Sequence, residues 1–176
     1  RGRQSRRRYP LKKPTWAQIR PWITLKRLAM LIACAMSVFH IYVGVFGSLH
    51  AMRQGGLHLL FALVLVFLLY PAHKGRKDKS PAFYDWVLIA ASLASLGYVL
   101  LNFEWIAFER FRYVTPVRIA EKVFGIMLVL VILEAARRTI GLFLTIVAGL
   151  FIVYLFAGPI LPGILYHPGA SLEDFL

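Results

Sequence analysis

The residues best placed for chemistry are Glu134, Arg137 and Arg138, which end an apolar run that begins at Ile126. On a helix, residues three and four positions apart share a face, so the carboxylate of Glu134 can reach both guanidinium groups. An acid within a membrane segment is a candidate proton or sodium relay. We favour a second interpretation, an ion pair that anchors two helices at a water interface, with Gly141 helping the chain to turn.

Two histidines form a weaker candidate site. His40 lies past the middle of the apolar segment 28–47, and His58 lies near the start of segment 57–70. If the two segments cross a membrane in opposite directions, the imidazoles lie at similar depth, where two histidines can ligate a haem between helices. The alternative is that each ring forms a hydrogen bond with a neighbouring helix. No catalytic motif and no metal-binding motif accompanies them, so the sequence does not predict an enzyme.

The elements that position these residues are apolar segments of membrane-spanning character. Of the 176 residues, 59% are hydrophobic and 16% are charged, whereas about a quarter of the residues of a soluble domain are charged. We therefore predict an all-α, polytopic helical membrane protein with about five transmembrane helices. The apolar segments are residues 28–47, 57–70, 84–101, 120–136 and 139–157. A span needs about 20 residues, so segment 57–70 is short unless it includes residues 51–56.

The distribution of positive charge predicts the orientation. Ten of the 21 Lys and Arg residues precede residue 28, which places the N-terminus in the cytoplasm and, after five spans, the C-terminal stretch outside. Trp16 and Trp22 beside basic residues are typical of the headgroup layer. We interpret residues 1–27 as a basic cytoplasmic tail with an interfacial segment that binds anionic lipids, and not nucleic acid, because no recognition motif accompanies the charge.

Charged residues also gather in the predicted external loop and just after it. They are Glu104, Glu109, Arg110, Arg112, Arg118 and Glu121. They can form a vestibule that attracts anions, but solvated surface ion pairs are the interpretation we favour. Further along, residues 171–174 have the pattern of a helix N-terminal capping box.

Several stretches together resemble a known transporter family. They are Leu57-His-Leu-Leu-Phe-Ala-Leu, Phe67-Leu-Leu-Tyr-Pro71, Tyr84-Asp-Trp86, Glu109-Arg110, Thr115-Pro116, Leu133-Glu-Ala-Ala-Arg-Arg-Thr-Ile-Gly141, Phe156-Ala-Gly-Pro159, Pro162-Gly163 and His167-Pro-Gly169. In this order and spacing, over about residues 40–176, they resemble the N-terminal, small-subunit-like part of fused permeases of tripartite ATP-independent periplasmic (TRAP) transporters. The type that works with TAXI-class solute receptors is the most similar.

The resemblance implies a multi-pass protein of the bacterial inner membrane that takes part in sodium-driven import of organic acids. Residues 28–136 would form a four-helix scaffold domain. Residues 137–176 would form a junction helix and an external loop that leads into a large transport domain in the continuing chain. The implied partners are that domain and a periplasmic TAXI-type receptor. The sodium ion would be bound by the complete transporter, since no residue here matches a ligand motif of the family.

Two other interpretations stay open at this point. One is a small membrane redox protein with haem between His40 and His58, and the other is a free-standing membrane anchor.

Overall fold

The chain folds into long helices joined by connections of different lengths. The computed structural model describes residues 16–70, 72, 81–111 and 115–175, with side chains from residue 24 onward. The α-helices are α1 (Trp16–Phe46), α2 (Ala51–Leu69), α3 (Phe83–Leu101), α4 (Ile119–Thr139), α5 (Leu142–Ala157) and α6 (Leu172–Phe175). Shorter turns are the π-helix η1 (Trp105–Glu109) and the 3₁₀ helices η2 (Gly158–Ile160) and η3 (Gly163–Leu165). The predicted all-α class is confirmed for the described residues, which contain no strand.

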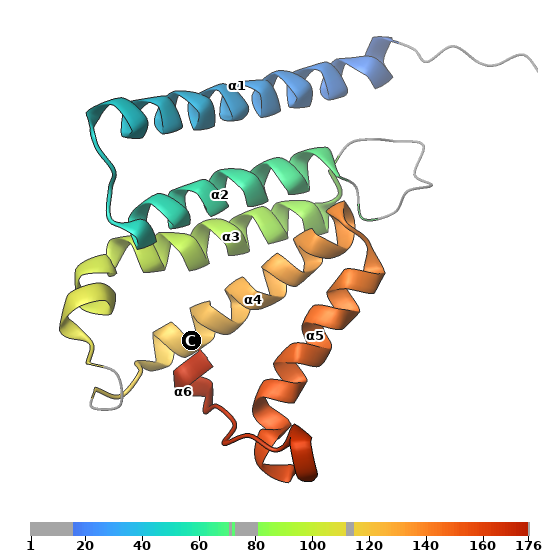
Figure 1. The fold of residues 1–176 in the computed structure, drawn as a ribbon. Coiled ribbons are helices and arrows are strands. Elements are labelled where there is room, and N and C mark those ends of the chain that lie inside the picture. The colour runs from blue at the N-terminus through green and yellow to red at the C-terminus, as the bar shows by residue number, and fades with distance from the viewer. Residues whose placement is uncertain (1–15, 71, 73–80, 112–114, 176) are drawn as a thin grey trace, which may run out of the picture.

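Helices α1 to α5 run alternately in opposite directions (Figure 1). Helix α3 packs against α2 on one side and α4 on the other, and α2 also touches α4. Helix α1 packs against α2, and α5 packs against α4. The three helices α2, α3 and α4 therefore form the centre, with α1 and α5 as outer helices.

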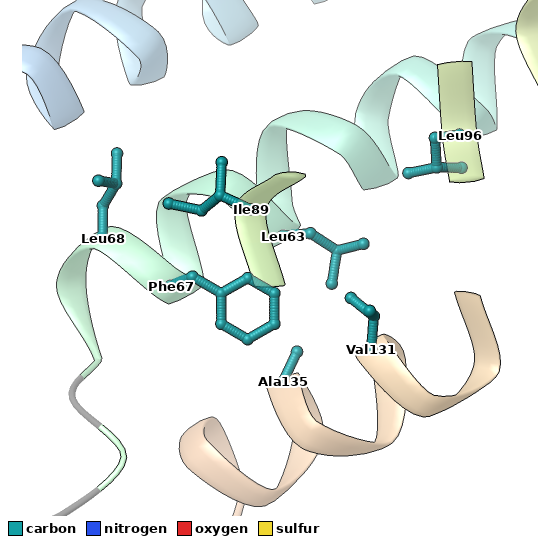
Figure 2. Close-up of a cluster of buried hydrophobic side chains, with 7 residues drawn as sticks. All are labelled: Leu63, Phe67, Leu68, Ile89, Leu96, Val131 and Ala135. Atoms are coloured by element: carbon teal, nitrogen blue, oxygen red, sulfur yellow. The ribbon is translucent and has the colours of Figure 1, made fainter. Parts of the chain in front are cut away.

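The core lies where these three central helices meet (Figure 2). Its buried side chains are Leu63, Phe67 and Leu68 of α2, Ile89 and Leu96 of α3, and Val131 and Ala135 of α4. On α3, the small residues Ser92 and Ser95 are fully buried, and each hydroxyl donates to the carbonyl four residues earlier. Small residues let helices approach closely in membranes, which explains why α3 occupies the middle position.

Four helical segments of the described chain are long and apolar enough to cross a membrane. They are Thr24–Phe46, Ala51–Leu69, Phe83–Leu101 and Leu142–Ile160. The fifth expected segment, 120–136, forms α4, which lies beside α3 and is about 30 Å long at 1.5 Å per residue. Its charged residues are confined to its two ends, at positions 121, 122, 134, 137 and 138. Multi-pass membrane character follows from these helices.

Two element boundaries differ from the expected ones. Helix α2 begins at Ala51 and so includes residues 51–56, which gives it a spanning length. Helix α1 begins at Trp16, so the expected interfacial segment and the first span form one continuous helix that contains Trp16 and Trp22. The tail 1–15, most of the basic loop at 71–80 and Arg112 lie outside the described residues.

The outer helices expose apolar side chains. Helix α5 has no buried residue, and Phe143, Leu150 and Phe151 are each more than 60% exposed. On α1, Leu31, Ile41 and Val45 are exposed to a similar degree. Apolar exposure on this scale is costly in water. These faces are therefore suited to lipid or to a partner helix.

After α5 the chain turns back toward the start of α4. The His167 ring lies against Gly158, where a Cβ atom would come within 2.3 Å of the ring. The backbone carbonyl of Tyr154 lies 3.0 Å from His167 Nε2, and the N–H of Gly169 donates to Nδ1 at 3.0 Å. The expected capping box is confirmed, because the N–H of Asp174 donates to Ser171 Oγ and the N–H of Ser171 donates to Asp174 Oδ2.

We expect Gly158→Ala to displace this returning segment, because the added methyl group and the His167 ring cannot occupy the same space. The measurement is cross-linking by a short bifunctional maleimide between cysteines at positions 122 and 173, whose native side chains form a 2.6 Å ion pair, in a Cys34→Ala background. Gly158→Ala should lower the cross-linking yield several-fold. Gly149→Ala is the matched control, since its Cβ would meet nothing within 4 Å. Equal yields in both variants would contradict this packing.

Candidate functional site

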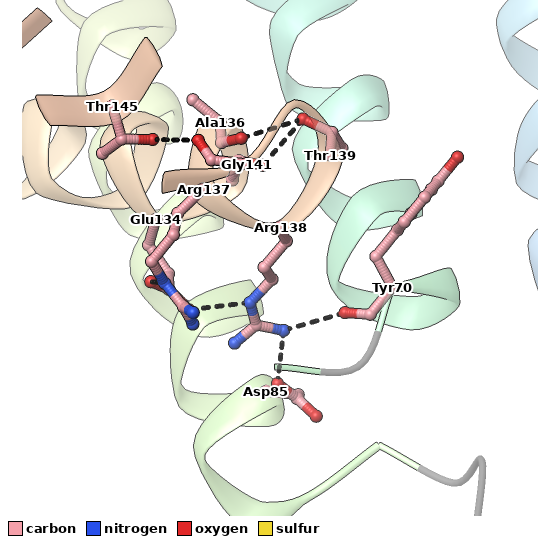
Figure 3. Close-up of polar contacts among 10 residues, drawn as sticks. Tyr70, Asp85, Glu134, Ala136, Arg137, Arg138, Thr139, Gly141 and Thr145 are labelled. Carbon is pink, nitrogen blue, oxygen red and sulfur yellow. Dashed lines mark hydrogen bonds and ion pairs between the residues drawn. The ribbon is translucent and has the colours of Figure 1, made fainter. Parts of the chain in front are cut away.

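The most buried polar contact of the described chain joins Arg138 to Asp85. Arg138 Nη1 donates to Asp85 Oδ1 at 2.6 Å, and the two side chains are 0% and 2% exposed (Figure 3). The same Nη1 donates to the backbone carbonyl of Tyr70 at 3.1 Å. One guanidinium thus connects the end of α2, the start of α3 and the end of α4.

Glu134 bridges the two arginines, as predicted from its spacing. Arg137 donates from Nε to Oε2 at 2.7 Å and from Nη2 to Oε1 at 2.8 Å, and Arg138 Nε donates to Oε1 at 2.8 Å. Gly141, with φ of 111°, makes the turn between α4 and α5, so its predicted role is also confirmed. The expected domain boundary at 136/137 falls inside α4.

The two arginines differ in their surroundings. Arg137 is 36% exposed, whereas the side chain of Arg138 is fully buried and points into the bundle. That both mark a water interface stays a prediction, but Arg138 meets a carboxylate inside the bundle and not solvent. The physical reason is Asp85, because a buried guanidinium becomes tolerable when a carboxylate and further acceptors surround it.

Local structure presents each acceptor to Arg138. Asp85 lies in the first turn of α3, and its Oδ2 accepts the N–H of Ala82 at 2.7 Å, which leaves Oδ1 for the arginine. Tyr70 follows the last residue of α2, where helix carbonyls have no partner within the helix. The Arg138 guanidinium also lies 4.9 Å from the centre of the Phe67 ring, a distance suited to cation–π attraction.

This arrangement anchors helices and leaves no carboxylate free for a relay. Both oxygens of Asp85 and both oxygens of Glu134 accept hydrogen bonds. A relay carboxylate must gain and lose a cation during its cycle, whereas these are held by two arginines and a backbone N–H. The geometry favours the anchoring interpretation of Glu134, Arg137 and Arg138.

Ion pairs also join the elements at the opposite end of the bundle. Glu121 is 7% exposed and accepts from Trp105 Nε1 at 2.9 Å and from Arg110 at 3.0 Å. Arg53 and Glu104 form a more exposed pair at 2.6 Å. These contacts pair Glu104, Arg110 and Glu121, three of the six charges expected to form a vestibule. The Arg53–Glu104 pair is exposed, as the interpretation as surface ion pairs expects, whereas Glu121 is buried.

The structure brings His40 and His58 together between α1 and α2. His58 Nδ1 lies 3.0 Å from His40 Nε2, and His40 Nδ1 lies 2.7 Å from the backbone carbonyl of Met36. Because a carbonyl only accepts, His40 Nδ1 carries the hydrogen and its Nε2 presents a lone pair. The two rings line an open pocket of about 390 Å³ together with Ala51, Gln54 and Gly55.

This spacing is too short for a haem between the two rings. Two nitrogens bound on opposite sides of one iron, at roughly 2 Å each, are about 4 Å apart. The rings of His40 and His58 are in direct hydrogen-bonding contact instead. A haem would require α1 and α2 to separate.

Asp85 and the Tyr70 carbonyl are the functional residues that sequence reasoning missed. Asp85 stands 53 positions from Arg138, and helix periodicity carries no information over that distance. One signal was present, because Asp85 lies at the start of an apolar segment, as Glu121 also does, and such an acid needs a partner.

Comparison with protein-family models, with curated proteins and with solved structures finds no match to this chain. Among the described residues, no group of three or more His, Cys, Asp or Glu side chains is arranged to hold a metal ion. The interpretation of the sites therefore depends on their own geometry.

We expect Asp85→Asn and Arg138→Met each to lower the free energy of unfolding by about 3–5 kcal/mol, because each leaves a buried polar partner without its counter-charge. The double variant should be destabilised by less than the sum of the two single variants, because each single variant leaves the other residue unpaired. That difference in the free energy of unfolding measures the direct interaction of the two residues. The measurement is reversible unfolding in detergent micelles.

The matched control for this cycle is the exposed pair Arg53 and Glu104, whose side chains are 43% and 66% exposed. Arg53→Met and Glu104→Gln should each change the free energy of unfolding by no more than about 1 kcal/mol. If Asp85→Asn changed the free energy of unfolding as little as these variants do, the conclusion that the buried pair stabilises the bundle would be refuted.

Proposed function

We propose that this chain is the scaffold part of a TRAP-type secondary importer of organic acids in the bacterial inner membrane. Its role is to hold a transport domain in the membrane and to help receive a TAXI-type receptor. The observation that supports this role best is the cluster of Asp85, Glu134, Arg137 and Arg138, in which every carboxylate oxygen is engaged and Arg138 also reaches the Tyr70 carbonyl at the end of α2, so that three helices are joined. Such a cluster suits a static frame.

The outer helices suit the same role. Helix α5 has no buried residue and follows the anchor directly, after the turn at Gly141. An apolar helix that packs against α4 and exposes its other side chains can pack against a further membrane domain. The order of motifs along the sequence, which resembles that of fused TRAP permeases, supplies the identity of that domain.

Two alternative functions predict different properties of the purified protein. A redox protein with haem between His40 and His58 would show a Soret absorption band, but the 3.0 Å contact of the rings disfavours it. A free-standing anchor would need neither a receptor nor a transport domain. Uptake that depends on a sodium gradient is expected of the scaffold in its complete transporter, and it is expected of neither alternative.

We expect opposite ends of the bundle to label from opposite sides of the membrane. In a Cys34→Ala background, cysteines at positions 53 and 171 should react with an impermeant maleimide from the periplasm, and a cysteine at position 140 from the cytoplasm. The native residues there are Arg53, Ser171 and the 66%-exposed Ile140. Labelling of position 171 from the cytoplasm alone would contradict the proposed orientation.

We expect proteoliposomes that contain this chain with its transport domain to take up the solute that co-purifies with the receptor. Uptake should require both the receptor and an inward sodium gradient, and replacing sodium by potassium should abolish it. Radiolabelled or mass-detected solute inside the vesicles is the measurement. Uptake that persists without receptor and without a sodium gradient would refute the proposal.

The Glu134→Gln variant distinguishes an anchor from a relay in this assay. As an anchor, it should lower the amount of folded protein while uptake per molecule keeps its sodium dependence. As a relay, it should abolish the sodium dependence in protein that is still folded. Glu104→Gln, which alters an exposed ion pair, is the matched control.

A further inference from the structure

We propose that His40 and His58 form a binding site for a divalent transition-metal ion of the zinc class, with Gln54 as a third ligand. This proposal is independent of the transporter function, because it concerns the outer face of α1 and α2 and not the charge cluster. It starts from the distance of 3.0 Å between His40 Nε2 and His58 Nδ1.

That distance suits two ligands that are adjacent on one ion. Zinc–nitrogen bonds are about 2.0–2.1 Å long, so two nitrogens at angles between octahedral and tetrahedral are roughly 2.9–3.4 Å apart. The same distance excludes ligands on opposite sides of an ion. The distance that disfavours haem therefore fits a small ion bound by both rings once the rings turn, because in the hydrogen bond the His40 Nε2 lone pair is directed at His58 Nδ1 and not at a shared ion.

The tautomer of His40 is already the one that a metal ligand needs. Its Nδ1–H donates to the Met36 carbonyl at 2.7 Å, which fixes the ring and leaves the Nε2 lone pair for an ion. Metal-binding histidines typically donate their other N–H to such an acceptor. His58 Nδ1 now carries the hydrogen shared with His40, and moving that proton to Nε2 frees a second lone pair without changing the net charge.

The pocket supplies the remaining ligand positions. Gln54 precedes His58 by one helical turn on α2, and both residues line the open pocket of about 390 Å³. Ala51 and Gly55 form other parts of the wall, and their small size leaves room for water. Two imidazoles, an amide oxygen and one water make four-coordinate zinc.

The test measures binding of Zn²⁺ to the purified chain, produced with a streptavidin-binding tag in place of a polyhistidine tag. We expect one ion per chain by isothermal titration calorimetry, and a tetrahedral Co²⁺ absorption band when cobalt is used. His58→Ala should weaken Zn²⁺ binding at least tenfold, since removing a direct ligand costs no less than removing a supporting residue, which costs about 10–100-fold.

Two further variants keep the proposal falsifiable if a histidine variant unfolds. Gln54→Glu replaces an amide oxygen by a carboxylate and should tighten Zn²⁺ binding about tenfold or more if the side chain faces the ion. His50→Ala is the matched control, because it removes a histidine at the same corner whose Nδ1 instead accepts the N–H of Met52. Absent binding at millimolar Zn²⁺, or binding that His58→Ala and Gln54→Glu leave unchanged, would overturn the proposal.

Discussion

The buried guanidinium of Arg138 is the constraint on which the rest of the fold depends. A charge removed from water costs several kcal/mol unless acceptors surround it. Here the acceptors come from three places far apart in the chain, namely Asp85, Glu134 and the Tyr70 carbonyl. They can converge only if α2 ends where α3 begins and the end of α4 lies against both. The need to surround this buried charge with acceptors therefore selects the arrangement of the three central helices. The apolar core of Leu63, Phe67 and Val131 then packs between the same helices.

The two ends of the bundle are stabilised by different kinds of contact. At the Arg138 end, both side chains of the ion pair are almost completely buried. At the other end, the pairs Arg53–Glu104 and Lys122–Glu173 are partly exposed, and exposed pairs contribute little to stability. Local opening should therefore begin at the end that holds η1 and α6, because low local stability follows few buried contacts. A bundle built in this way is stiff at one end and adaptable at the other.

Local rules were sufficient to predict part of this structure. The contacts of Glu134 with Arg137 and Arg138 follow from helical spacing, and the turn at Gly141 follows from glycine between two apolar runs. The similar depth of His40 and His58 follows from antiparallel segments, but their contact also depends on how each helix is rotated, which a single sequence does not specify. Asp85 was missed because its partner lies on another helix. The early start of α1 was missed because polar and basic residues continue the helix beyond the apolar segment.

The two polar sites differ in how completely their hydrogen-bonding groups are used, and this difference separates their roles. Each carboxylate oxygen near Arg138 is engaged, and the one guanidinium nitrogen without a partner among the described residues, Nη2, belongs to a group that faces the Phe67 ring. Such a site keeps one buried donor and no free carboxylate acceptor. The His40–His58 pair keeps the Nε2 lone pair of His58, and its rings line an open pocket. In an apolar environment, engaged polar groups stabilise structure, whereas groups with spare capacity can bind ligands. This difference is the reason that we propose ligand binding at the α1–α2 hairpin and an anchoring role for the cluster on α4.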